Sequence, residues 1–291
     1  MTAFRLAHLS DPHLTPPPIR WRTRDIVSKR LLSRFAWRRK QHQHAKAVLD
    51  ALTADIAARA PDHIAVTGDL TNFSTPEEFA AAAAWLTTLG DPADVTVSPG
   101  NHDALVARGA PRDFAPWADW LGDGDEGFPH LRVRGPVAIV NLSSAVPTPV
   151  HSARGRLGPA QIEAAAALLR QAEGLYRVVL IHHPPAAGLV SGRKSLADAD
   201  ALRAVLADTG ADLILHGHSH EGSLAAVRGP KGPIPVLGAA SASTPAGGRH
   251  SAAGWNEIAI TRDGEGFRAE VAVRGVGGDL HVETLGRYGL A

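Results

Sequence analysis

Residues 211–220, ADLILHGHSH, pass from an apolar segment directly into a cluster of three histidines. A short run of Leu and Ile between polar residues is typical of a buried strand. His216, His218 and His220 follow at alternate positions where this strand would end. Because imidazole is the commonest metal ligand in proteins, the function of this stretch depends on whether other strand ends supply partners for it.

The same strand pattern recurs along most of the chain and alternates with helical periodicity. Strands are predicted in residues 4–10, 63–69, 94–103 (a strand that runs into a loop), 137–144, 176–185 and 211–220. Apolar residues at helical spacing predict helices at 42–59, 76–89, 158–173 and about 199–208. Thr75 and Glu78 form a capping box with Pro76 at the first helical position, which marks where the second of these helices begins. This alternation predicts a layered α/β domain.

The C-terminal part of the sequence has a different pattern. PIPVLGAAS, WNEIAIT and FRAEVAV predict strands joined by Gly-rich turns, without a helix between them, so part of the sheet system is expected to be antiparallel. No internal repeat or low-complexity linker divides the 291 residues. We therefore expect one domain over residues 1–291, with a basic helical insertion at about 15–46 and a strand-rich part at about 222–291.

Composition restricts the chemistry of any site. The chain has no cysteine, which excludes disulfides, thiolate nucleophiles and zinc–cysteine sites, so a metal must be held by His, Asp, Glu or Asn. The N-terminal residues lack the basic cluster and apolar core of a signal peptide. Apolar runs are far shorter than the ~18–20 residues of a membrane span. We expect a soluble cytoplasmic protein.

Potential metal ligands occur at the ends of five predicted strands. Each group taken alone is compatible with an ordinary turn, but five such groups, all at strand ends, would converge on one rim of the sheets. Carboxylates, an amide and imidazoles suit Mn²⁺, Fe²⁺, Zn²⁺ or Mg²⁺. Seven groups are too many for one tetrahedral ion and suit two ions ~3.5–4 Å apart that share a carboxylate. The seven residues are Asp11, His13, Asp69, Asn101, His182, His218 and His220.

In their order and spacing, these motifs resemble those of the calcineurin-like metallophosphoesterase superfamily. The motifs are Asp11-Pro12-His13, Gly68-Asp69-Leu70-Thr71-Asn72, Gly100-Asn101-His102-Asp103, His182-His183-Pro184 and Gly217-His218-Ser219-His220. The resemblance implies a four-layer α/β/β/α sandwich of two mixed sheets flanked by helices. It also implies hydrolysis of a phosphoester by in-line attack of a metal-bound hydroxide, with two divalent ions (Mn, Fe or Zn).

The resemblance also implies a role for each motif residue. One ion would be bound by Asp11, His13 and His220. The second would be bound by Asn101, His182 and His218, with Asp69 as the bridge. His102 would be the catalytic histidine beside the substrate phosphate, either donating a proton or hydrogen-bonding a phosphoryl oxygen.

Three further residues have expected supporting roles. Asn72 would support the site near Asp69. Asp103 would either orient His102 or serve only a turn. His216 lies outside the superfamily pattern, so we expect it to be a packed or hydrogen-bonded core histidine.

Three functions are compatible with these motifs. The motif style is most similar to the class III phosphodiesterases that act on cyclic nucleotides or glycerophosphodiesters, which favours a phosphodiesterase with a small-molecule phosphoester substrate. A membrane-surface phosphohydrolase acting on a lipid-linked phosphate or pyrophosphate is the first alternative. A non-catalytic binding scaffold is the second, although the intact ligand set argues against it.

The basic segment is the main sequence feature outside the motifs. Between Thr15 and Lys46 the chain has ten Lys or Arg residues and one acid, Asp25, although the net charge of the whole chain is only +1. A helical wheel of residues 25–40 places Val27, Leu31, Leu32 and Phe35 on one face. That face could pack on the body with the basic residues solvated, or the segment could form a lid beside the site.

Residues 20–40 could instead contact an anionic membrane, placing the protein at the inner membrane surface. Nucleic acid is disfavoured, because a pI of about 8.3 is modest. A homodimer is left open.

Overall fold

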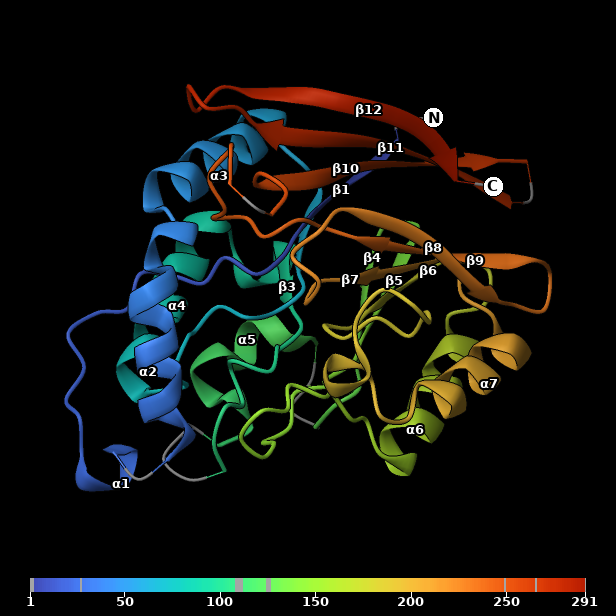
Figure 1. Ribbon diagram of the computed structural model, residues 1–291. Helices are drawn as coiled ribbons and strands as arrows, with labels where there is room; N and C mark the ends of the chain where they lie inside the picture. Colours follow the sequence, from blue (N-terminus) through green and yellow to red (C-terminus); the bar gives the residue numbers. More distant parts are fainter. Residues whose placement is uncertain are drawn as a thin grey trace.

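The computed structural model describes residues 3–26, 28–107, 112–123, 127–248, 250–264 and 266–290. Two mixed sheets of six strands pack face to face, and helices cover the two outer faces (Figure 1). The four-layer α/β/β/α sandwich that the resemblance implied is therefore confirmed.

The first sheet combines a parallel half with an antiparallel half. Its strand order is β12-β11-β10-β1-β2-β3. The β1, β2 and β3 strands run parallel, whereas β10, β11 and β12 are antiparallel neighbours that come from the C-terminal part of the chain. The strand bounds are β1 Phe4–Leu9, β2 His63–Val66, β3 Val95–Val97, β10 Gly254–Asp263, β11 Gly266–Val276 and β12 Val282–Leu290.

The second sheet has four parallel strands between two antiparallel edges. Its order is β4-β5-β6-β7-β9-β8, with β5, β6, β7 and β9 parallel. The bounds are β4 His130–Arg134, β5 Val137–Asn141, β6 Tyr176–Leu180, β7 Leu213–His216, β8 Ser223–Arg228 and β9 Pro233–Gly238. The edge strands β4 and β8, like β12 in the first sheet, were not predicted, because their alternating or largely exposed side chains give a weak apolar signal.

Helices pack on both outer faces of the sandwich. The bounds are α1 Thr23–Ile26, α2 Lys29–Lys40, α3 Lys46–Arg59, α4 Pro76–Leu89, α5 Ala118–Leu121, α6 Pro159–Gln171 and α7 Ala199–Thr209. Short 3₁₀ turns are η1 Gln41–Gln43, η2 Pro92–Asp94, η3 Arg112–Trp117 and η4 Gly192–Lys194. The Thr75–Glu78 capping box of α4 is formed as predicted. The helix expected at 42–59 begins only at Lys46, because residues 41–43 form η1.

Three apolar clusters fill the spaces between the four layers. Leu9, Leu52 and Leu86 belong to the cluster between the first sheet and helices α3 and α4. A second cluster fills the space between the sheets, and a third lies between the second sheet and helices α6 and α7. Because Ile139 and the adjacent Val140 are both fully buried but belong to different clusters, both faces of β5 are covered. This double coverage explains why the central strands are continuously apolar.

Candidate metal centre

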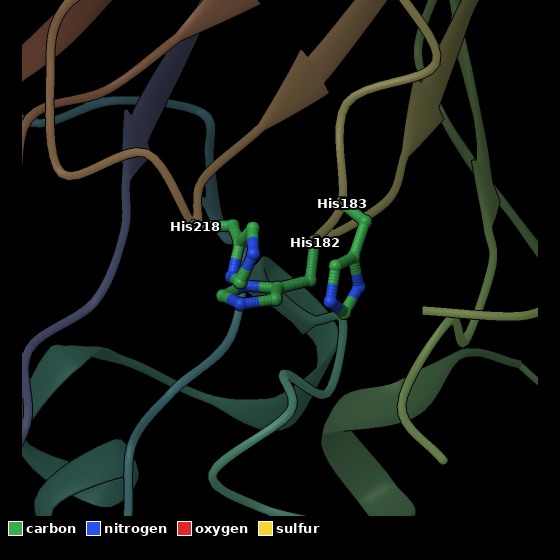
Figure 2. Close-up of side chains that lie close together, drawn as sticks. All are labelled: His182, His183 and His218. Atoms are coloured by element: carbon green, nitrogen blue, oxygen red, sulfur yellow. The ribbon is translucent and has the colours of Figure 1, made fainter. Parts of the chain in front are cut away.

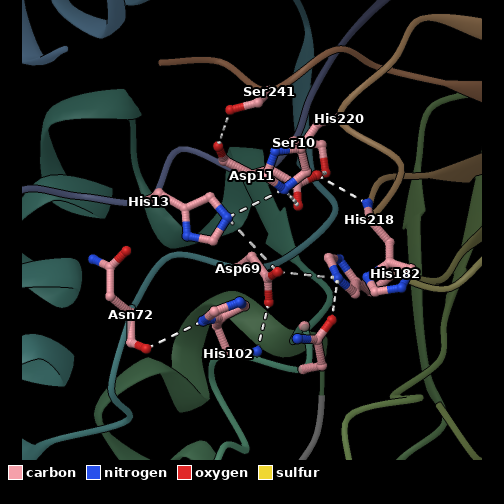
Figure 3. A network of polar contacts seen from close by, with 12 residues as sticks. Ser10, Asp11, His13, Asp69, Asn72, His102, His182, His218, His220 and Ser241 are labelled. Carbon is pink, nitrogen blue, oxygen red and sulfur yellow. Dashed lines mark hydrogen bonds and ion pairs between the residues drawn. The ribbon is translucent and has the colours of Figure 1, made fainter. Parts of the chain in front are cut away.

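The five predicted ligand motifs meet at one rim of the sandwich. They lie on the loops that follow β1, β2, β3, β6 and β7, where parallel strands end. Figure 3 shows their side chains converging from segments that are up to about two hundred residues apart in the sequence. Sequence reasoning therefore predicted correctly which residues come together.

The loops hold several of these residues in an unusual backbone conformation. Five of them adopt positive φ: Asp11 (51°), His13 (40°), Asp69 (56°), His218 (68°) and His220 (59°). Left-handed φ at a residue other than glycine costs of order 1–3 kcal/mol and persists only where the surroundings impose it. This strain aims the side chains of successive loop residues into one small volume.

The motif glycines allow the loops to approach one another. A Cβ on Gly100 would lie 2.2 Å from Asp69 Oδ1, and one on Gly217 would lie 1.8 Å from Ser10 Oγ and 2.5 Å from Asp11 Oδ2. Real Cβ atoms do not tolerate such distances, so only glycine fits at these two positions. The glycines of the motifs therefore determine the spacing of the predicted ligands.

Asp11, His13 and His220 form the first cluster. His220 Nε2 lies 3.2 Å from Asp11 Oδ1 and 3.3 Å from His13 Nε2. The ligand atoms of these three residues and of Asp69 all lie within 4.8 Å of one another. Two facing imidazole nitrogens share at most one proton, whereas a cation satisfies both lone pairs.

Asn101, His182 and His218 form the second cluster. His182 Nδ1 donates to the carbonyl of Thr67 at 2.6 Å, which directs its Nε2 toward the ligand set, 3.3 Å from Asn101 Oδ1. His218 is buried beside His182, with ring centroids 5.0 Å apart (Figure 2). This set offers one amide oxygen and two imidazole nitrogens.

Asp69 lies between the two clusters. Its Oδ2 is 3.8 Å from His13 Nε2 and 3.4 Å from His182 Nε2. Its Oδ1 accepts the backbone N–H of His102 at 2.7 Å, which fixes the rotation of the carboxylate. Asp69 Oδ2 therefore faces both ligand sets.

Unpaired buried atoms show that the pocket fits cations. His218 Nε2 is buried and has no hydrogen-bond partner among the described residues, and the described contact of the buried Asp11 Oδ1 is with His220 Nε2, another metal-ligand atom, at 3.2 Å. Burying such polar atoms without a partner is costly, and in a group of His and Asp side chains a bound metal ion commonly satisfies them. The donor chemistry, carboxylate, amide and imidazole without sulfur, suits divalent cations of the Mn, Fe or Zn type.

Burial and neighbouring charges set the ionisation that metal binding requires. Burial lowers the pKa of His13 well below its ordinary value, so its ring is a neutral lone-pair donor. Burial opposes ionisation of Asp69, but the positive charge of His182 outweighs it and holds the pKa of Asp69 well below the ordinary value. Asp69 is therefore a carboxylate at neutral pH. Against the effect of burial, the Asp69 charge raises the pKa of His182 to about 9, so a cation at His182 Nε2 would replace a proton there.

His183 lies beside the second cluster but is held away from it. Its ring lies near those of His182 and His218 (Figure 2), and one ring nitrogen of each of the three histidines lies within 4.8 Å of the other two. However, His183 Nδ1 accepts from Ser144 Oγ at 2.7 Å and its Nε2 donates to the carbonyl of Ala153 at 3.1 Å. With both ring nitrogens engaged, His183 has a structural role.

His102 lies at the edge of the centre with one ring nitrogen fixed. Its Nδ1 donates to the carbonyl of Asn72 at 3.1 Å (Figure 3), which leaves Nε2 for a group in the cleft that His102 lines. This geometry agrees with a histidine that contacts substrate and does not bind metal.

Asp103 has the second of its two expected roles, because it supports the backbone of the motif loops. Its carboxylate accepts the backbone N–H groups of Asp69, Thr71 and Gly100, each at 2.9 Å, and makes no contact with the His102 ring. Unpaired loop N–H groups need an acceptor, and Asp103 supplies it for two motif loops at once. The expectation that Asp103 orients His102 is therefore wrong.

Asn72 also supports the site indirectly. Its side chain donates to the carbonyl of Leu14 at 2.8 Å and so joins the loop after β2 to the loop after β1. Its own carbonyl positions His102 rather than Asp69.

His216 is separate from both clusters, as expected. It ends β7, is fully buried, donates from Nδ1 to the carbonyl of Gly217 at 2.9 Å and contacts Ser223 Oγ at 3.3 Å through Nε2. Of the three histidines in residues 215–220, only His218 and His220 point to the centre.

The centre opens into a cleft of ≈ 330 Å³ whose outer wall was not predicted from the sequence. That wall includes Trp37 of α2, His44, Lys194 of η4 and His250. The ring centroid of His44 is 4.5 Å from that of His13, and Ser243 Oγ lies 2.8 Å from His44 Nδ1. These residues come from segments without a recognisable motif, so only their positions in the fold connect them to the centre.

Comparisons with known proteins agree with this architecture. A dimetal phosphatase from Danio rerio is similar, with a TM-score of 0.62 and 13% identity over 100% of this chain and 99% of that chain. A purple acid phosphatase from yellow lupin seeds has a TM-score of 0.59 and 12% identity over 99% of this chain and 53% of that chain. The NAD nucleotidase of Haemophilus influenzae has a TM-score of 0.50 and 13% identity, covering 98% and 54%. At such identities, the likeness shows the fold alone.

A search of curated proteins found no match. The sequence matches the family model described as calcineurin-like phosphoesterase over residues 4–222. This range is more than half of the 291 residues and includes all five motifs. The chain therefore belongs to the calcineurin-like phosphoesterase family.

Proposed function

We propose that this protein is a phosphodiesterase with a dinuclear metal centre. The observation that carries the proposal is the position of Asp69 Oδ2, which lies 3.8 Å from His13 Nε2 and 3.4 Å from His182 Nε2. One carboxylate oxygen between two ligand sets suits two cations that share a bridge. Family membership and the phosphatases with the same fold support hydrolysis of phosphoesters.

Each cation would have its own ligand set. Asp11, His13 and His220 would hold one ion, and Asn101, His182 and His218 would hold the other. When bound, two divalent cations supply a water of lowered pKa and neutralise charge on the phosphoryl oxygens. The remaining chemistry belongs to the protein.

His102 would act on the phosphoryl group. Because its Nδ1–H is held by the Asn72 carbonyl, Nε2 is directed to the cleft and can carry the proton that a leaving oxygen requires. The Asp69–His102 backbone hydrogen bond of 2.7 Å fixes the histidine relative to the bridging carboxylate. Orientation of this kind supplies part of the rate enhancement.

The shape of the cleft favours a diester over a monoester. The cavity of ≈ 330 Å³ continues past the ligands to Trp37, His44 and Lys194, which leaves room for a second substituent on phosphorus. Trp37 offers an apolar surface to this substituent and Lys194 offers a positive charge.

Hydrolysis of matched chromogenic esters tests the proposal. Protein stripped of metal and reconstituted with Mn²⁺, Fe²⁺ or Zn²⁺ is assayed on bis-p-nitrophenyl phosphate and p-nitrophenyl phosphate. We expect metal-dependent hydrolysis with a higher kcat/KM for the diester. A higher kcat/KM for the monoester would contradict diester specificity, and hydrolysis that is independent of metal would contradict the whole mechanism.

A further inference from the structure

Helix α2 is attached to the body by its polar face. Arg30, one of its first residues, is only 1% exposed and donates to the carbonyls of Phe73 and Ser74 and to Asp25 Oδ1. Lys29 Nζ donates to Thr148 Oγ1 and to the carbonyl of Ser152, each at 2.8 Å. The expected burial of the apolar stripe is therefore wrong for Leu32 and Phe35, which are exposed, and the expected solvation is wrong for Arg30. Val27, the first residue of that stripe, lies outside the described residues.

Aromatic contacts complete the inward face of α2. The Trp37 ring meets Phe73 edge to face at a centroid distance of 6.1 Å. The guanidinium of Arg34 lies 4.5 Å from the centroid of Trp21. Arg30, Arg34 and Trp37 lie on one side of α2, because they are spaced four and three residues apart. The inward face thus includes Arg30 and Arg34, two basic residues that the sequence pattern places off the apolar face.

The outward face of α2 is apolar as a consequence. Leu32 is 50% exposed and Phe35 is 54% exposed, and Ile26 in the adjacent α1 is 53% exposed. Exposed apolar side chains are common singly, but neighbouring ones on a helix face indicate an interaction surface. Figure 1 shows α2 at the periphery of the molecule.

Basic side chains border this apolar face. Arg38 and Arg39 are exposed in the last turn of α2, and Arg20 and Arg22 are exposed in the segment that precedes it. Residues 15–46 contain a single acid, Asp25, and it is buried against Arg30. A helix face with Leu and Phe flanked by arginines is complementary to the headgroups and acyl chains of an anionic bilayer.

The same helix forms a wall of the cleft. Ser33, Ala36 and Trp37 line the cavity above the metal centre, and Ala36 is adjacent in sequence to Phe35. A surface docked on Leu32 and Phe35 would therefore lie next to the cleft entrance. No helix among the described residues is long and apolar enough to cross a membrane, so such docking would be peripheral.

We propose that the outward face of α2, with Leu32, Phe35, Arg38 and Arg39, docks on anionic phospholipid membranes and presents the cleft to phosphoesters at that surface. The assignment of a surface-bound substrate rests on the proposed phosphodiesterase function, whereas membrane docking does not. A second copy of the chain fits the face less well, because a two-fold contact would bring together two faces that are both bordered by arginines.

Vesicle co-sedimentation of the full-length protein tests docking. Vesicles of phosphatidylcholine alone are compared with vesicles that also contain phosphatidylglycerol. We expect binding to the anionic vesicles, weakened at least ~10-fold by the double change Leu32→Ser with Phe35→Ser. A similar loss is expected for Arg38→Gln with Arg39→Gln, because each basic residue contributes about fivefold at an anionic surface. Leu285→Ser is the matched control, since Leu285 is 64% exposed on β12.

Two readouts separate docking from the proposed function. Thermal unfolding confirms that each variant is folded, and hydrolysis of bis-p-nitrophenyl phosphate without vesicles is expected to stay at the wild-type rate. Equal binding to neutral and anionic vesicles, or wild-type binding by the Leu32/Phe35 variant, would overturn the proposal. If the wild-type protein were a dimer and the Leu32/Phe35 variant a monomer, the face would be assigned to contact with a second copy. If the wild-type protein bound no vesicles, the face would be assigned to a protein partner. Either result would contradict membrane docking. Absence of hydrolysis by the metal-loaded wild-type protein would instead overturn the proposed function.

Discussion

Asp69 uses its two carboxylate oxygens differently. Oδ1 accepts the His102 backbone N–H at 2.7 Å, while Oδ2 faces His13 and His182. Its backbone has a φ of 56°, and the N–H of the same residue is held by Asp103 at 2.9 Å. The residue is thus fixed from both its side chain and its main chain, as a bridge between two ions would require.

Replacing Asp69 with Ala is expected to release at least one metal ion. Removing the shared oxygen takes a ligand from both sets, so we expect kcat/KM on bis-p-nitrophenyl phosphate to fall by at least ~100-fold. Metal content per chain, measured by elemental analysis after dialysis, checks the first effect. Asp208→Ala is the control, because Asp208 is 74% exposed and pairs only with Arg170 at the surface in the described structure. Two ions retained by Asp69→Ala would refute the bridging role.

Replacing His102 with Ala is expected to spare the metal and slow the chemistry. We predict unchanged metal content and a kcat lower by roughly 10²–10⁴-fold on an alkyl ester, whose leaving group needs a proton. The loss on p-nitrophenyl esters should be smaller, since p-nitrophenolate leaves without one. Equal losses on both substrates would indicate that His102 only binds the phosphoryl group, and full turnover on both would remove it from the mechanism.

At the scale of elements, the motif loops hold the ligand residues in place and helix α2 forms one wall of the cleft. Asp103 joins the loops after β2 and β3 through backbone N–H groups, and Asn72 joins the loop after β2 to that after β1. Helix α2 contributes the outer wall of the cleft and is held by Arg30. The position of α2 therefore depends on a charged side chain that is only 1% exposed.

Replacing Arg30 with Met is expected to destabilise the protein and loosen α2. The change removes the Arg30 donor from Asp25 Oδ1 and from two backbone carbonyls, for a cost of about 3 kcal/mol in the free energy of unfolding. Urea unfolding measures this loss, and faster amide exchange confined to residues 28–44 locates it. Arg38→Met changes an exposed arginine of the same helix and is expected to alter stability by less than about 0.5 kcal/mol. Equal stability of the two variants would show that Arg30 does not anchor the helix.

At the scale of the molecule, the sandwich buries several histidines in neutral form away from the cleft. His63 is 0% exposed at the start of β2, where its Nε2 contacts Thr96 Oγ1 at 2.8 Å. Burial, with a contribution from the positive charge of Arg132, lowers the pKa of His63 to about 3. The unfolded chain binds a proton at this residue below about pH 6.5, while the folded protein does not until about pH 3.

Stability should therefore fall as the pH is lowered. The contribution of His63 is fully present above pH 6.5 and is lost by about 1.4 kcal/mol per pH unit between that value and its folded pKa. Urea unfolding of the metal-free protein at pH 7.5, 6 and 5 measures the slope. In the His63→Gln variant we expect the dependence of the free energy of unfolding on pH to be weaker by the contribution of one titrating group, about 1.4 kcal/mol per pH unit. An identical slope in the variant would contradict neutral burial of His63.

Local signals predicted the layered α/β domain and the converging residues, whereas the four-layer sandwich was implied by the resemblance to the metallophosphoesterase superfamily. Apolar runs such as 176–185 mark buried strands, and the polar clusters at their ends share a rim in any parallel sheet. The sequence could not predict which face of α2 packs on the body. Arg30 is buried because it donates to the carbonyls of Phe73 and Ser74, and those contacts depend on the tertiary structure. The role of Asp103 and the position of His44 likewise depend on contacts between segments far apart in the chain.

Metal titration coupled to hydrolysis tests the central claim most directly. Metal-free protein is titrated with Mn²⁺ while bound metal per chain and the rate on bis-p-nitrophenyl phosphate are measured in the same samples. The seven-residue centre around Asp69 predicts that hydrolysis reaches its maximum when two ions are bound per chain. Maximal hydrolysis with one ion bound, or two bound ions without hydrolysis, would contradict a two-metal phosphodiesterase.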